Sequence, residues 1–260
     1  MSRLRFEAPQ RTGSLKDWLR AQALGVSVRL RPPQPYFLDA PHGESVSLLE
    51  AFANWCARHP GASARVLLSG ALTHQYVLPL EGAQTLYGQA RTRFARRHFV
   101  HYYGEQAQNW PLETWAQTQR HGACAVHGID VSALQGAAKR HRVRLHTVEP
   151  VWAWALRWVS LHQPAWAQAP SVALVFVERT LLTWMLCTQG SIVQIQQRRL
   201  QCANLQELAG CLETLKSPHD PAMPVWVGGF GLDCNTPLAA PVFKEFTALD
   251  GAHMPQVLLT

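Results

Sequence analysis

The chain has 260 residues, a net charge of +7 and a hydrophobic fraction of 47%. A chain of this length buries a core large enough to fold without disulfides or a structural metal. No apolar run reaches the roughly 18 residues of a membrane-spanning helix, and the opening Met1-Ser2-Arg3-Leu4-Arg5 lacks the apolar stretch of a secretory signal. We therefore expect a cytoplasmic protein without a transmembrane helix.

Cysteine and histidine spacing predicts no metal site. The cysteines at positions 56, 124, 187, 202, 211 and 234 form no C-x-x-C pair and match no zinc or haem pattern. Without an export signal, buried and reduced thiols are expected. His98 and His101 stand at i, i+3 spacing, but zinc needs three or four ligands. We interpret this pair as surface histidines.

Basic residues are distributed unevenly along the chain. One group lies within residues 1–31, a second consists of four arginines within 91–97, and a third lies within 139–144, whereas residues 203–260 are acidic. Such asymmetry indicates an anionic partner for one face, which could be membrane headgroups, nucleic acid or an acidic protein. A solvated basic face without a partner is the alternative.

Hydrophobic periodicity and breaker residues predict alternating helices and strands. In chain order these are helices at 14–24 and 46–59, strands at 64–69 and 74–78, a helix from 84 to about 103, a strand at 122–127, a helix at 130–141, a strand at 143–148, a tryptophan-rich helix after Pro150, strands at 171–177, 181–187 and 190–196, a helix at 204–215, and strands at 225–227 and 255–260. The strands at 64–69 and 74–78 are expected to pair, because only a short turn separates them. The pattern indicates an α/β fold with mixed sheets.

The motifs of common enzyme classes are absent. The chain contains no G-x-S-x-G, no G-x-x-x-x-G-K-[ST] and no G-x-G-x-x-G, which removes the main signals for a serine hydrolase, a P-loop protein and a Rossmann dinucleotide-binding protein. The remaining glycine element follows a predicted strand and contains Gly228 and Gly229. Glycine there lets a backbone approach a ligand closely, and it also suits a tight turn.

The order of elements between Ala64 and Leu200 resembles the actin-like cytoplasmic domain of type IV pilus and type II secretion assembly platforms (the PilM/GspL type). Residues 64–80, 90–95, 123–150 and 171–193 carry the resemblance. It implies an actin-like (ribonuclease H-like) α/β fold of mixed sheets with two lobes. Residues 1–60 would be the N-terminal part of the first lobe, 61–165 the first lobe with an inserted strand–helix–strand subdomain, and 166–260 the second lobe.

The departures from the family's pattern concern the phosphate turns. An actin-like ATPase carries Asp-x-Gly turns in two hairpins, where glycine exposes backbone N–H groups to phosphate and the acid helps to hold Mg²⁺. The corresponding hairpin reads Val177-Glu178-Arg179-Thr180 without a glycine, and Asp39-Ala40-Pro41-His42-Gly43 matches the first turn poorly. The resemblance therefore implies a degenerate, non-enzymatic fold with no catalytic residue and no cofactor. Gly228 and Gly229, which resemble the family's adenosine-side turn, are the remaining candidates for contact with ATP.

Three functional hypotheses follow. The first is a non-catalytic cytoplasmic scaffold, peripheral to the inner membrane, that docks on the cytoplasmic segment of an inner-membrane pilus or secretion protein. Arg93, Arg96 and Arg97 would form a basic ridge that contacts the partner or anionic lipid. The second is a diverged actin-like ATP-binding protein. The third is a nucleic-acid-binding protein that uses the arginine clusters, and it is the weakest because no nucleic-acid-binding motif occurs. A homodimer is left open.

Overall fold

The computed structural model describes residues 34–38, 45–79, 86–117, 120–162, 169–216, 218–219 and 223–231. The elements predicted at 14–24 and 255–260, and the poor phosphate-turn match at 39–43, lie outside these ranges. The described helices are α2 (Ser45–Arg58), α4 (Gln89–Tyr103), α5 (Val131–Arg140), α6 (Val151–His162) and α8 (Leu205–Lys216), with 3₁₀ turns η1 (Gly70–Leu72) and η2 (Glu105–Asn109).

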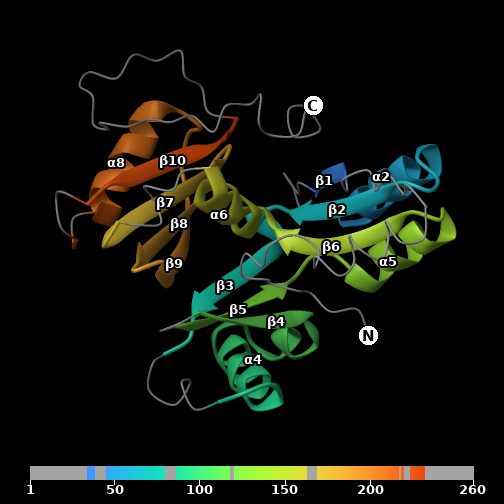
Figure 1. Ribbon diagram of the computed structural model, residues 1–260, viewed down its shortest axis with the longest axis horizontal. Helices are drawn as coiled ribbons and strands as arrows, with labels where there is room; N and C mark the ends of the chain where they lie inside the picture. The colour runs from blue at the N-terminus through green and yellow to red at the C-terminus, as the bar shows by residue number, and fades with distance from the viewer. Residues whose placement is uncertain are drawn as a thin grey trace, which may run out of the picture.

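The described strands form three sheets (Figure 1). The first contains β1 (Gln34–Leu38), β2 (Ser63–Leu68) and β6 (Arg144–Pro150) in the order β1-β2-β6; the second contains β7 (Ser171–Glu178), β8 (Leu181–Thr188), β9 (Ser191–Arg199) and β10 (Val225–Phe230) in the order β10-β7-β8-β9; the third contains β3 (Thr73–Val77), β4 (Leu112–Ala116) and β5 (His121–Val126) in the order β3-β5-β4. The mixed α/β class expected from the sequence is confirmed.

The four-stranded sheet is buried on both faces. β7, β8 and β9 run antiparallel in sequence order, and β10 lies parallel to β7. Successive side chains of a strand point to opposite faces. Val172, Leu174 and Phe176 therefore pack towards α6, while Ala173, Val175 and Val177 pack towards α8. This two-sided burial explains why residues 172–177 are continuously apolar, because a strand covered on both faces lacks the polar alternation of an exposed one.

The β1-β2-β6 sheet is entirely parallel. Parallel neighbours need a crossover connection, which is usually helical. Here α2 connects β1 to β2, and α5 leads into β6. Both helices contribute to one apolar cluster with this sheet, through residues such as Phe52 of α2 and Leu134 of α5. The described part of the predicted N-terminal segment thus joins the same sheet as β2; the predicted domain boundaries themselves stay a prediction.

Helix α6 lies between the first two sheets, in the middle of the molecule (Figure 1). Val151, Trp152, Ala155 and Val159 are almost completely buried and belong to one apolar cluster with Leu67 of β2 and with the inner face of the four-stranded sheet. Trp152 therefore belongs to the core where the two sheets meet, and Trp154 packs against it partly buried.

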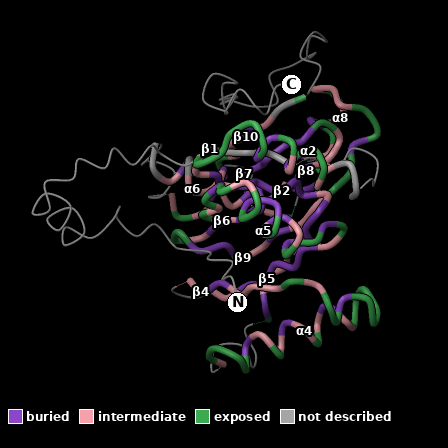
Figure 2. The backbone as a smooth tube through the Cα atoms, turned by 90° about the vertical axis from the view of Figure 1, so that its right-hand side faces the viewer, coloured by how far each residue is buried: buried purple, intermediate pink, exposed green. Residues whose placement is uncertain are grey.

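The third sheet and α4 form a separate layer, at the bottom of Figure 2. Phe99 and Ala95 of α4 pack on Ala123 and Ala125 of β5. Across the sheet, Trp115 of β4 stands opposite Gly122 of β5. A Cβ at position 122 would lie only 1.9 Å from the Trp115 ring, so the indole takes the space that a side chain would fill.

The predicted pairing of the strands at 64–69 and 74–78 is wrong. Both strands exist, but β2 pairs with β1 and β6, whereas β3 pairs with β5. The 3₁₀ turn η1, with Leu72 buried, separates them. Both strands have partners elsewhere in the chain, which a local turn signal does not indicate. The helix expected from 84 is described from Gln89, and strand β4 was not predicted.

None of the described helices is long and apolar enough to cross a membrane. Among the described residues, no group of three or more His, Cys, Asp or Glu side chains is placed to hold a metal. His98 instead stacks on Tyr76, with ring centroids 4.2 Å apart, and His101 stands edge-on to Tyr102.

A stack of imidazole and aromatic rings covers one part of the third sheet. The His74 ring lies between those of Tyr103 and His127, with both centroid distances 4.1 Å, and 5.4 Å from that of Trp110. Burial, and secondly the neighbouring His127, lower the pKa of His74 to about 4. Burial also lowers the pKa of His127. The folded protein therefore holds His74 neutral at pH values where a free imidazole is protonated.

We predict that the free energy of unfolding decreases as the pH falls from about 6.5 towards 4. In this window the unfolded chain binds protons that folded His74 excludes, so acid favours unfolding, and the stabilisation is complete above about pH 6.5. His74→Phe keeps a ring in the stack and removes the titration. Urea unfolding at several pH values should show that this variant loses less free energy of unfolding in acid than the wild type. Equal pH dependence in both proteins would contradict the prediction.

Candidate functional site

The site with the most distinctive geometry lies where the end of β2 meets the turn between β7 and β8. Glu178, the last residue of β7, is only 5% exposed. Its carboxylate accepts hydrogen bonds from the backbone N–H of Gly70, at 2.9 Å to Oε1 and 3.2 Å to Oε2. Gly70 is the first residue of η1, which follows β2. One buried carboxylate therefore joins the first and second sheets.

Gln197 of β9 completes this junction. Its Nε2 donates a hydrogen bond of 2.9 Å to the carbonyl oxygen of Gly70, so both backbone groups of one residue are held by side chains from the four-stranded sheet. A Cβ on residue 70 would lie 2.5 Å from Gln197 Nε2 and 3.0 Å from Glu178 Oε1. A side chain at position 70 would therefore displace the two side chains that converge on this residue.

The glycine element predicted at Gly228 and Gly229 lies beside the same turn. Gly229 pairs with Val177 of β7, has φ 143°, and a Cβ there would lie 2.0 Å from the Val177 carbonyl oxygen. Gly231 has φ 74°, and its Cβ would lie 2.5 Å from Cγ of Arg179. Close packing of β10 on β7 therefore explains the glycine at position 229 without a nucleotide. Contact of Gly228 and Gly229 with ATP stays a prediction.

This junction is arranged for holding parts of the protein together. A backbone N–H at the start of a helical turn can bind a phosphate oxygen, but here a carboxylate of the same chain takes the N–H of Gly70. The turn itself contains Arg179, which adopts φ 54°, a left-handed conformation that glycine adopts with less strain. The carboxylate of Glu178 is directed at the backbone N–H of Gly70.

A second buried acid, Glu149, lies under α6. Its Oε1 accepts a hydrogen bond of 2.7 Å from Nη2 of Arg157 and lies 3.3 Å from Nε of Arg65. Burial lowers the pKa of Arg65, Glu149 opposes this by raising it, and Arg157 lowers it further. These contacts connect β2, β6 and α6. The cluster was not predicted from the sequence.

The three arginines of the predicted ridge on α4 do not share one environment. Arg93 and Arg97 are exposed. Arg96 is half-buried and donates through Nη1 to the carbonyl oxygens of Ala107, at 3.0 Å, and of Trp110. Its guanidinium fastens η2 to the helix. Arg91, another member of the sequence cluster, is buried and donates to the carbonyl oxygen of Leu86 at 3.1 Å.

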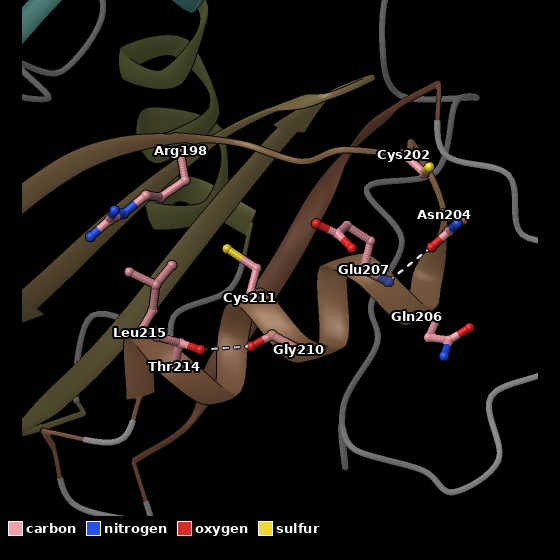
Figure 3. Close-up of a pocket in the computed structure, with 9 residues that line it drawn as sticks. All are labelled: Arg198, Cys202, Asn204, Gln206, Glu207, Gly210, Cys211, Thr214 and Leu215. Carbon is pink, nitrogen blue, oxygen red and sulfur yellow. Dashed lines mark hydrogen bonds between the residues drawn. The ribbon is translucent and has the colours of Figure 1, made fainter.

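A hollow of about 680 Å³ lies between the end of β9 and α8 (Figure 3). Its polar residues have structural partners: the side chain of Asn204 accepts from the N–H of Glu207 at 2.8 Å, and Glu207 Oε1 accepts from the N–H of Gln201 at 3.2 Å. These bonds satisfy backbone donors at and before the start of α8.

Of the cysteines, Cys56, Cys124 and Cys187 are buried as expected, whereas Cys202 is exposed.

Part of the site has a sequence signal and part has none. The absence of glycine at Glu178 and Arg179 is visible in the sequence. The partners of Glu178 are not, since Gly70 is 108 residues away along the chain, and Gln197 is 127 residues from Gly70. Nothing in the residues around Gly70 indicates a buried carboxylate.

We predict that Glu178→Ala lowers the free energy of unfolding by about 2–3 kcal/mol. The change removes a charged acceptor and leaves the buried N–H of Gly70 without its partner. Glu178→Gln should cost less, because the amide oxygen can still accept the hydrogen bond. Urea denaturation followed by tryptophan fluorescence measures both.

Glu213→Ala is the matched control, because Glu213 is exposed on α8 and its loss should change the stability by less than about 0.5 kcal/mol. Equal effects at positions 178 and 213 would show that the carboxylate at the junction contributes nothing particular to the fold.

Comparison with known proteins gives matches at the level of structure alone. No protein-family model and no curated protein matches the sequence. A Bacteroides thetaiotaomicron protein described as having an actin-like ATPase fold and unknown function superimposes with a TM-score of 0.48 at 10% identity, over 72% of this chain and 69% of that one.

Two further solved structures belong to assembly systems. A PilM–PilN type IV pilus biogenesis complex matches with a TM-score of 0.48 at 11% identity, over 74% of this chain and 72% of that one. The cytoplasmic domain of EpsL, an inner-membrane component of the type II secretion system of Vibrio cholerae, matches with a TM-score of 0.42 at 13% identity, over 81% and 78% of the two chains. The structures similar to this α/β chain thus include an actin-like ATPase fold, a pilus complex and a secretion component.

Proposed function

We propose that this protein is a non-catalytic cytoplasmic scaffold of a type IV pilus or type II secretion-like machine, peripheral to the inner membrane. The observation that carries the proposal is the Glu178 carboxylate on the N–H of Gly70. Glu178 stands in the hairpin where an actin-like ATPase would carry Asp-x-Gly, and here its carboxylate is used for internal cohesion. The sequence resemblance over residues 64–200 supplies the class of machine.

The proposed docking surface consists of exposed residues on and next to α4. Tyr87, just before the helix, is 76% exposed and Tyr102, near its end, is 66% exposed. Arg93 and Arg97 are exposed between them. Exposed aromatic rings next to arginines are typical of protein interfaces. A cytoplasmic segment with acidic and apolar residues, from an inner-membrane partner, has the complementary chemistry.

A bacterial two-hybrid screen against the cytoplasmic segments of inner-membrane pilus and secretion proteins tests the docking. We predict a positive partner whose signal is lost with Arg93→Glu, Arg97→Glu and Tyr102→Ser combined, because the change reverses the charge and removes the ring. Arg198→Glu with Arg199→Glu, both exposed on β9, is the control and should keep the signal. The absence of any partner, or equal loss in both variants, would refute the docking surface.

Calorimetry with ATP and Mg²⁺ separates the scaffold from the alternative of a diverged ATP-binding protein. We predict no heat of binding for the full chain, because Glu178 and Gln197 already hold both backbone groups of Gly70. Saturable binding in the micromolar range would instead support the alternative, and its loss on Gly228→Val would place the nucleotide at the glycine element.

A further inference from the structure

Basic side chains from separate parts of the sequence meet at one end of the β1-β2-β6 sheet. The last turns of α2 and α5 and the first residue of β6 lie at the right-hand end of the molecule in Figure 1. The five basic residues exposed there, called the basic end below, are Arg58, Lys139, Arg140, Arg142 and Arg144. Within the described part of the chain the ion pairs join Glu149 to Arg65 and Arg157, and none involves the basic end.

Backbone hydrogen bonds hold the basic end in place. The N–H of Gly61, after α2, donates to the carbonyl oxygen of Arg142 at 3.2 Å, and the N–H of Arg144 donates to that of Ala62 at 2.8 Å. The turns that end the two helices are therefore fixed to each other. Positive charge from α2, α5 and β6 is presented on one ordered surface.

Helix stability accounts for only some of these charges. Cations in the last turn of a helix interact favourably with its dipole, which suits Arg58, Lys139 and Arg140. Arg142 lies beyond α5 with φ 58°. The N–H of Arg142 donates to the carbonyl oxygen of Lys139, and that of Val143 to Ala138. This is the helix-ending motif whose left-handed residue is usually glycine.

The adjoining loop uses glycine for this conformation. Gly61, three residues after the end of α2, has φ 75°. A β-carbon makes this conformation unfavourable for any residue except glycine, and Asn and Asp tolerate it best among the others. Arginine at position 142 thus works against local folding, and its exposed guanidinium has no ion-pair partner among the described residues. Its charge is therefore available to a ligand outside the fold.

We propose that the basic end binds the anionic headgroups of a lipid bilayer. Each Lys or Arg near such a surface contributes about 1 kcal/mol, which is about fivefold in affinity. Proteins that bind single-stranded nucleic acid combine basic grooves with aromatic platforms, whereas the large hydrophobic side chains exposed in the described structure, Tyr87, Tyr102 and Tyr103, belong to the α4 region. A basic surface without exposed aromatic rings matches an anionic surface whose charge is spread evenly, as in a lipid bilayer. This inference stands without the proposed partner.

Vesicle flotation with the full chain tests it, using phosphatidylcholine vesicles with and without phosphatidylglycerol. Binding is expected only with phosphatidylglycerol, and high salt should abolish it, because screening weakens exposed charges. Lys139→Gln, Arg140→Gln and Arg144→Gln combined should weaken binding by a factor on the order of a hundred. The control, Arg93→Gln, Arg97→Gln and Arg199→Gln combined, removes the same charge from other exposed sites and should bind like the wild type.

Arg142→Gly separates the charge from the fold. It should leave the melting temperature unchanged or higher, since glycine suits φ 58°, and should weaken vesicle binding about fivefold. Unchanged vesicle binding by the triple variant, or equal loss in the control, would overturn the proposal. So would binding of duplex DNA, measured by gel shift, that depends on the basic end while vesicles are not bound.

Discussion

The fold depends on one buried backbone group, the N–H of Gly70, and on the carboxylate that satisfies it. Buried amides need a partner, and a carboxylate is among the strongest acceptors in a protein. Because the acceptor, Glu178, ends β7 and the donor follows β2, this bond fixes two sheets relative to each other. Helix α6 packs in the space between them, with Trp152 only 2% exposed. The core at the centre of the molecule is therefore built around a polar junction.

That junction also bears on the proposed function. A turn that binds phosphate leaves its backbone N–H groups open to the ligand. Here the acid is inside the junction and Arg179 takes the left-handed turn position. The features available for recognition are accordingly at the periphery, on α4 and at the basic end. In the proposed scaffold, the interior would keep these outer surfaces at fixed positions.

Local signals in the sequence were sufficient for most elements and insufficient for their partners. The runs at 171–177 and 181–187 are apolar and β-branched, so strands β7 and β8 were predicted within one residue of their ends. The family resemblance also implied that these two strands form a hairpin, and they do pair. β2 and β3 are equally recognisable, yet their pairing was predicted wrongly, because each has its partners elsewhere in the chain. The contact of Glu178 with Gly70 is non-local in the same way.

The arginines illustrate most clearly what local sequence signals do not reveal. In the sequence, Arg96 and Arg142 are equivalent members of basic clusters. Arg96 donates hydrogen bonds to the carbonyl oxygens of Ala107 and Trp110. Its guanidinium therefore stabilises the fold and is only partly available to a ligand. Arg142 occupies a backbone conformation that glycine would adopt with less strain. The fold accounts for the position of the Arg96 guanidinium, whereas it makes no ion pair with Arg142 among the described residues. Backbone geometry thus distinguishes two arginines that net charge and spacing treat alike.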